Sequence, residues 1–208
     1  RQRPSRKLRV PVAGPAAQPV LACTAAALSG FAALAYEVAW TRLLALVIGP
    51  TTYDFSTMAP AFLTGIALGA AAGSRLVRRV SRPHLWLAAM LVVTAATAWI
   101  AIWFTASRLP LHLARELAAT DAFESVLLRQ VATVAVLLLP TGIALGATFT
   151  MALATASSGA ATAGRDAALV YGANTCGAVA GALLAGFVLL PRLGLQGTAA
   201  AVTVVTLG

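Results

Sequence analysis

Charged residues are the scarcest class in this sequence. Only 10% of the 208 residues are Asp, Glu, Lys or Arg, whereas 60% are apolar. A water-soluble domain needs a far more polar surface, so the composition excludes one. Stretches of roughly 20 apolar residues, enough to cross a bilayer core about 30 Å thick, recur along the chain. We therefore expect an all-α integral membrane protein that is solvated by the lipid bilayer.

Acidic residues and cysteines are also few. The two cysteines, Cys23 and Cys176, each lie inside an apolar run, with no second Cys or His at the spacing of metal ligands. This pattern gives no support for a disulfide framework or a zinc site. The six acidic residues are scattered along the sequence: Glu37, Asp54, Glu116, Asp121, Glu124 and Asp166. We therefore predict no catalytic residue, no metal site and no cofactor for this chain.

Basic residues set the net charge of +9, and they gather at the ends of the apolar stretches. A nucleic-acid surface needs them on a soluble face, so we expect no nucleic-acid partner. One side of the predicted membrane topology holds ten: Arg1, Arg3, Arg6, Lys7, Arg9, Arg75, Arg78, Arg79, Arg82 and Arg165. The other side holds four: Arg108, Arg115, Arg129 and Arg192. Because cytoplasmic loops carry the excess of Lys and Arg, we predict a bacterial inner-membrane protein with a cytoplasmic N-terminus.

The apolar stretches predict a bundle of about six transmembrane helices over residues 20–208, behind a basic cytoplasmic tail at 1–19. A short segment at 109–120, with leucines at helical spacing, is expected to lie as a helix in the membrane interface. Because the chain starts with Arg and ends inside an apolar run, we expect it to be part of a longer protein. The predicted spans are about 20–48, 53–76, 84–106, 123–156, 167–190 and an incomplete 198–208.

Glycines recur at four-residue spacing in three of these spans. Such a stripe lets helix backbones approach closely, so it predicts tight packing, with a sliding gate as the functional alternative. The hexapeptide Gly-Ile-Ala-Leu-Gly-Ala occurs twice, at 65–70 and 142–147, which fits either a three-plus-three duplication of helices or convergent packing. The glycines are Gly65, Gly69, Gly73, Gly142, Gly146, Gly177 and Gly181.

The first predicted span contains a charged residue, Glu37, far from either end of the span. Glu37 lies near mid-membrane, where charge is expensive, so it is a candidate for a functional site. Arg42 follows five residues later on another side of the helix and can reach towards the outer surface. Asn174 in the fifth span offers an amide partner from a second helix. Together with Tyr36 and Trp40, these residues predict either a small polar site or a polar contact that fixes helix register.

Three stretches of the sequence resemble a known family. They run from Ser29-Gly30-Phe31 to Tyr36-Glu37-Val38-Ala39-Trp40-Thr41-Arg42-Leu43, from Phe62 to Gly69, and from Tyr171-Gly172-Ala173-Asn174-Thr175 to Gly194. They are similar to the membrane portion of the fused, spermidine-synthase-like proteins of bacteria, in which a multi-span region precedes an aminopropyltransferase-like domain. The second span, with the arginines behind it, is more distantly similar to helices of major-facilitator transporters. The carboxylate cluster of the family's catalytic domain is missing, so we do not expect this chain alone to be an enzyme.

Three functions follow from these features. The main expectation is a structural or interaction subunit, or the membrane domain of a larger assembly, that packs against lipid and other membrane subunits. The second is transport or binding of a small cation such as a polyamine, through Glu37 with Tyr36, Trp40 and Asn174. The third is the membrane anchor of a fused aminopropyltransferase whose catalytic domain lies outside this chain.

Overall fold

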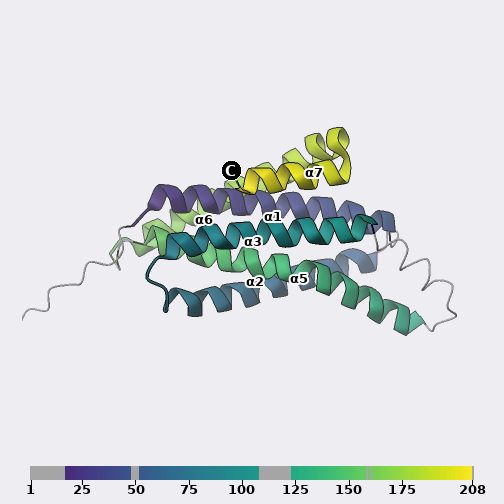
Figure 1. Cartoon of the computed structure of the whole chain (residues 1–208), viewed down its shortest axis with the longest axis horizontal. Helices are drawn as coiled ribbons and strands as arrows, with labels where there is room; N and C mark the ends of the chain where they lie inside the picture. Colours follow the sequence, from purple (N-terminus) through teal and green to yellow (C-terminus); the bar gives the residue numbers. More distant parts are fainter. Residues whose placement is uncertain (1–16, 48–51, 108–122, 158, 160, 208) are drawn as a thin grey trace, which may run out of the picture.

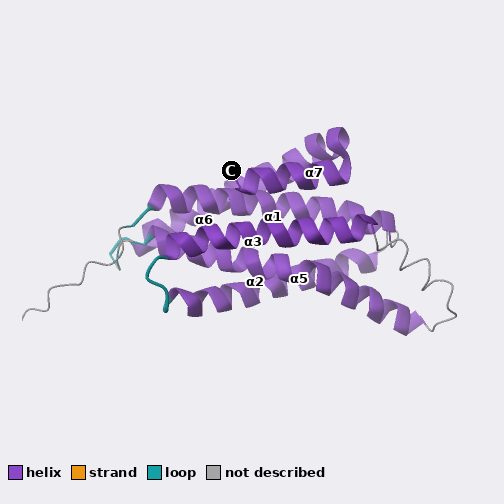
Figure 2. Cartoon of the chain, viewed as in Figure 1, coloured by secondary structure: helices purple, strands orange, loops and turns teal. Residues whose placement is uncertain are grey.

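A computed structural model describes residues 17–47, 52–107, 123–157, 159 and 161–207, and every regular element within these ranges is a helix (Figures 1 and 2). Five helical segments within these ranges have the length and the apolar composition to cross a membrane. The prediction of an all-helical fold, with helices long and apolar enough to span a membrane, is therefore confirmed for these residues. The elements are α1 (Pro19–Val47), α2 (Thr52–Val77), α3 (Pro83–Ser107), α5 (Phe123–Ala156), α6 (Ala163–Leu184), the π-helical turn η1 (Ala185–Leu189) and α7 (Leu190–Leu207).

The first four predicted spans agree with α1, α2, α3 and α5 to within one residue at each end. The turn predicted at 191–197, between the fifth and sixth spans, contains Gly194, where the chain reverses (Figure 1). Its φ of 65° and ψ of −174° are open to glycine without strain. The predicted fifth span, 167–190, differs from the structure, because α6 begins at Ala163 and the helical backbone continues through η1 past residue 190 to this reversal. The predicted interfacial helix at 109–120 and residues 1–16 of the predicted tail lie outside the described residues.

The bundle contains two pairs of parallel helices, α2 with α5 and α1 with α6. In the first pair, a methyl group added to Gly65 would lie 2.9 Å from the carbonyl oxygen of Leu139 and 3.1 Å from the Cα atom of Gly142. Further along, a methyl group on Gly73 would lie 3.1 Å from the Cα atom of Ala147. Contacts advance along both helices in the same direction, so α2 and α5 are parallel. At these glycines the two helices lie backbone against backbone.

The second pair is built in the same way. A methyl group added to Gly177 of α6 would lie 2.7 Å from the carbonyl carbon of Ala27 in α1, and one on Gly181 would meet the backbone of Phe31. On α1, Gly30 faces the backbone of Asn174. Because no side chain separates these backbones, α1 and α6 are held at a close distance along two helical turns.

The remaining helices connect and cover these pairs. α3 packs against α5, where the Thr141 hydroxyl donates a hydrogen bond of 3.2 Å to Thr97. α7 returns along α1 and α3 (Figure 1). α1 also contacts α5, so it joins the two pairs and lies at the centre of the bundle. The largest side chains of the core, Trp40 and Tyr36, belong to this central helix.

Candidate functional site

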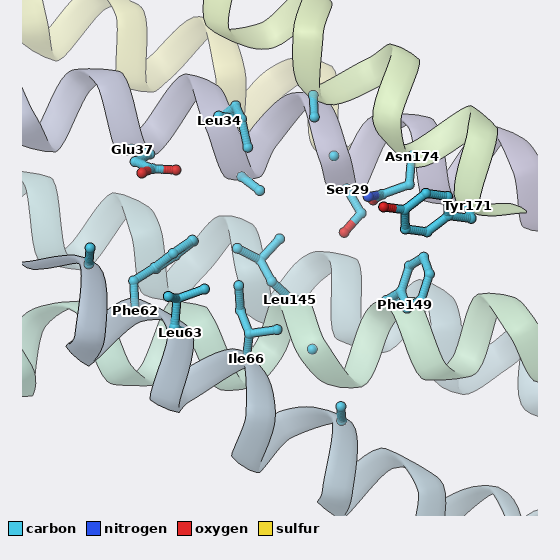
Figure 3. Close-up of a pocket in the computed structure, with 16 residues that line it drawn as sticks. Ser29, Leu34, Glu37, Phe62, Leu63, Ile66, Leu145, Phe149, Tyr171 and Asn174 are labelled. Atoms are coloured by element: carbon cyan, nitrogen blue, oxygen red, sulfur yellow. The ribbon is translucent and has the colours of Figure 1, made fainter.

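A cavity of about 390 Å³ lies between the two parallel pairs and is lined by residues of α1, α2, α5 and α6 (Figure 3). α1 and α5, which contact each other, form its floor, and α2 and α6 form its walls. Leu63 on α2 is 63% exposed and Tyr171 on α6 is 65% exposed, although both line the cavity. The cavity therefore opens to the surroundings between α2 and α6.

Glu37 lies at one end of this cavity, with its carboxylate directed into the space beside Phe62 and Leu63 (Figure 3). The side chain is half-buried. Its backbone carbonyl accepts a hydrogen bond of 2.8 Å from the Thr41 hydroxyl, but its carboxylate has neither an ion pair nor a hydrogen bond among the described residues. The carboxylate is thus turned into the cavity (Figure 3).

The other end of the cavity carries neutral polar groups. Ser29, Asn174 and Tyr171 gather there beside Phe149 (Figure 3). Ser29 is only 3% exposed, so its hydroxyl belongs to the interior, whereas the Tyr171 ring stands at the mouth. The Asn174 side chain lies against Gly30, whose missing side chain leaves room for the amide oxygen. This end can donate and accept hydrogen bonds without carrying a charge.

The two polar ends are separated by an apolar surface. Ser29 and Glu37 are eight residues apart on α1, which corresponds to about 12 Å at the rise of an α-helix. Leu34, Ile66 and Leu145 fill the stretch between them (Figure 3). Asn174 packs at the level of Gly30, so Glu37 and Asn174 share one cavity but lie about two helical turns apart. The two residues therefore do not form the direct contact that we had considered from the sequence.

Tyr36 and Trp40, which we had placed with Glu37, do not line this cavity. The Tyr36 hydroxyl shares a hydrogen bond of 2.9 Å with the hydroxyl of Thr203 in α7. Trp40 stacks on Tyr36 with ring centroids 6.0 Å apart and meets Phe62 edge-on at 6.2 Å. Its indole nitrogen is buried and has no hydrogen-bond partner within the described residues. Both aromatic side chains belong to the buried core.

Arg42 is exposed and lies away from the cavity. The five residues from Glu37 to Arg42 rotate the helix by about 140°, since each residue contributes about 100°. The structure therefore separates the two charges of α1, as the spacing predicted, and leaves Glu37 as the charged member of the cavity lining.

Sequence reasoning missed Ser29 and Tyr171 as members of this site. Both lie within the stretches that resemble the spermidine-synthase-like membrane region, but no spacing rule separates them from other polar residues of those stretches. Metal binding finds no support at the site: within the described ranges, no three His, Cys, Asp or Glu side chains come close enough together to hold an ion.

In comparisons with known proteins, no family model, curated protein or solved structure matches this chain.

Proposed function

We propose that this chain is a membrane domain that binds a small organic cation in the cavity between its two glycine-packed helix pairs. The carboxylate of Glu37 carries this proposal, because it faces a cavity of about 390 Å³ and has no partner among the described residues. An intramembrane carboxylate costs roughly 3 kcal/mol at the centre of a span, so a chain keeps one where a ligand or a partner compensates it.

A purely structural role for Glu37 fits the geometry less well. A carboxylate that fixes helix register is expected to accept a hydrogen bond from a neighbouring helix. Here the residues of α2 that line the cavity beside Glu37 are Phe62 and Leu63, and neither has a polar side chain (Figure 3). The space beside the carboxylate is instead large enough for a ligand. For this reason the geometry favours cation binding over the packing role that we had expected first.

An interaction subunit is the second candidate, and the outer face of α6 favours it. Gly172, Cys176 and Ala180 recur there at four-residue spacing and are all exposed, and nothing lies within 4 Å of the position that a Gly172 side chain would occupy. The same spacing holds α1 and α6 together inside the bundle. A helix of another membrane subunit on this face would flank the mouth of the cavity beside Tyr171. The two candidate functions are therefore compatible in one assembly.

The orientation of the chain and the membrane in which it lies form part of the same proposal. We propose that the N-terminus is cytoplasmic and that the chain lies in a bacterial inner membrane, supported by the distribution of Lys and Arg between the loops. A bundle of about six spans, with α7 as the sixth, the three-plus-three repeat and the spermidine-synthase-like relationship stay proposals as well. Reporter fusions after residues 17, 50, 80 and 160 test the orientation, since fusions after 17, 80 and 160 should report the cytoplasm.

Ligand-induced stabilisation of the purified protein tests the cation site. Small organic ammonium compounds should raise the midpoint of thermal unfolding in detergent, because a ligand at about 100 times its Kd stabilises the folded state by about 2.7 kcal/mol. Glu37→Gln should remove this stabilisation while keeping the side-chain volume. Asp166→Asn is the matched control, because Asp166 is bonded to Thr162 at the start of α6 and does not line the cavity.

Two outcomes would refute the cation site. One is a Glu37→Gln protein that folds and is stabilised by ammonium compounds as strongly as the parent protein. The other is a parent protein that no organic cation stabilises. If Glu37→Gln fails to fold, Glu37→Asp replaces it in the test. This variant keeps the negative charge but has a side chain that is one methylene shorter, so we expect it to bind the cation more weakly than the parent protein does.

A further inference from the structure

We infer that the ligand of this cavity is an elongated monocation: an ammonium group at one end, an apolar spacer in the middle, and a neutral hydrogen-bonding group at the other end. This inference rests on the proposed cation site and names the class of compound that it takes. It is based on the arrangement of polar groups in the cavity. Glu37 lies at one end, and the neutral polar residues Ser29, Tyr171 and Asn174 lie at the opposite end (Figure 3).

Charge limits the ligand to one full positive charge. Among the described residues that line the cavity, Glu37 is the only one with a charged side chain. A second ammonium at the far end would meet an amide and two hydroxyl groups, which cannot neutralise it in a site that lipid surrounds. A dication such as a simple diamine, and with it the polyamine class that the sequence brought forward, therefore fits the cavity less well than a monocation.

The far end calls for a group that both donates and accepts hydrogen bonds. Ser29 and Tyr171 carry hydroxyl groups and Asn174 carries an amide, so all three can act as donor or acceptor. A ligand hydroxyl or amide matches them, whereas a methyl end would leave the buried Ser29 hydroxyl facing an apolar group. The ligand should thus end in an alcohol or an amide.

The middle of the cavity sets the spacer. Leu34, Ile66 and Leu145 offer no polar atom on their side chains, so a polar group placed there would lose its hydration without compensation. The polar ends are about 12 Å apart along α1, which sets the length that the spacer has to cover. A linear alkyl chain of intermediate length satisfies both requirements.

Three compounds with the same eight-carbon chain and one shorter compound separate these features in an equilibrium binding assay on the full chain in detergent. Aminooctanol has both ends and the spacer, octylamine lacks the hydroxyl, diaminooctane adds a second charge, and aminobutanol is too short. We expect aminooctanol to bind tightest. Octylamine should bind about five-fold to ten-fold more weakly, as expected for one lost hydrogen bond, and diaminooctane about ten-fold more weakly. Aminobutanol should bind no tighter than butylamine, the reference compound of the same length without a hydroxyl group.

Variants at the far end make the test specific. Tyr171→Phe, at an exposed position where folding is not at risk, should reduce the preference for aminooctanol over octylamine by roughly three-fold to five-fold. Asn174→Asp places a carboxylate at the far end and should reverse the ranking, so that diaminooctane binds tighter than aminooctanol. Tyr36→Phe is the matched control, because Tyr36 lies outside the cavity and should leave the ranking unchanged.

The results distinguish this inference from the proposed function. If octylamine and aminooctanol bind equally and both depend on Glu37, or if diaminooctane binds tightest to the parent protein, the monocation inference is wrong and the cation site stands. If none of the four compounds shows a dependence on Glu37, the cation site itself is wrong. Should Asn174→Asp fail to fold, the ranking on the parent protein and on Tyr171→Phe decides the question.

Discussion

Replacement of Gly177 by alanine is the most direct test of the parallel packing that forms the cavity walls. The added methyl group would lie 2.7 Å from the carbonyl carbon and 2.9 Å from the Cα atom of Ala27. Ordinary van der Waals contact begins at 3.4 Å, so the carbonyl carbon alone requires α1 and α6 to separate by about 0.7 Å, and the carbonyl oxygen of Ala27, which lies nearer still, requires more. All three obstructing atoms are backbone, so no side-chain rotation can relieve the overlap.

The expected cost follows from this geometry. Extra methylene groups in a well-packed interior destabilise by about 1–3 kcal/mol, and an overlap with rigid backbone belongs to the upper part of that range. The gain in helix propensity from Gly to Ala is at most about 1 kcal/mol in the opposite direction. We therefore expect Gly177→Ala to lower the free energy of unfolding by about 2 kcal/mol.

The same helix supplies the control. Nothing lies within 4 Å of the position that a methyl group on Gly172 would occupy, so Gly172→Ala should be neutral or slightly stabilising. Unfolding of both variants by sodium dodecyl sulfate, followed by circular dichroism and tryptophan fluorescence, measures the difference. Equal stability of the two variants would mean that α1 and α6 do not approach each other in this way.

Two further results are expected from the packing and from the core. At the α2 and α5 interface, Gly69→Ala should destabilise by about 1 kcal/mol more than Gly73→Ala in the same assay, because a methyl group meets the Ile143 backbone at Gly69 but only looser contacts of 3.1 Å at Gly73. A double-mutant cycle of Tyr36→Phe with Thr203→Val should give a coupling energy of about 0.6 kcal/mol, the average for hydrogen bonds between membrane helices. A coupling energy of zero would mean that the 2.9 Å hydrogen bond between Tyr36 and Thr203 does not stabilise the protein.

Sequence reasoning located the helices because length and apolar composition alone define a membrane span. The boundaries of α5, Phe123–Ala156, equal those predicted, even though Pro140 lies inside the helix. The C-terminal boundaries were less accurate, since Pro191 was taken to end the fifth span. In the structure the helix extends to Gly194, because a π-helical turn at 185–189 carries it forward and the reversal needs a positive φ that a glycine supplies. Backbone conformation of this kind leaves no periodic signal.

The candidate site was predicted only in part, for a reason that lies in helix geometry. The cost of a charge in lipid identifies Glu37 without knowledge of its neighbours. Tyr36 and Trp40 are close to it in sequence, but one residue rotates the helix by about 100°, and the sequence does not say which face meets a cavity. The structure turns both aromatic rings into the core and brings in Tyr171 from α6. The glycine contacts decide which helices become neighbours. The sequence shows where these glycines are, but it does not show which helix each of them packs against.

The repeated hexapeptide has a physical explanation in that pairing. Gly65 lies opposite Gly142, while methyl groups on Gly69 and Gly146 would meet the backbones of Ile143 and Ile66 respectively. Each contact therefore has an equivalent with the helices exchanged, as in a parallel pair with a local two-fold axis, and equivalent positions need the same small residues. A three-plus-three duplication would instead relate the second span to the fifth, whereas the hexapeptides lie in the second and the fourth. The identity of 65–70 and 142–147 thus follows from close packing, and evidence for a duplication has to come from other positions.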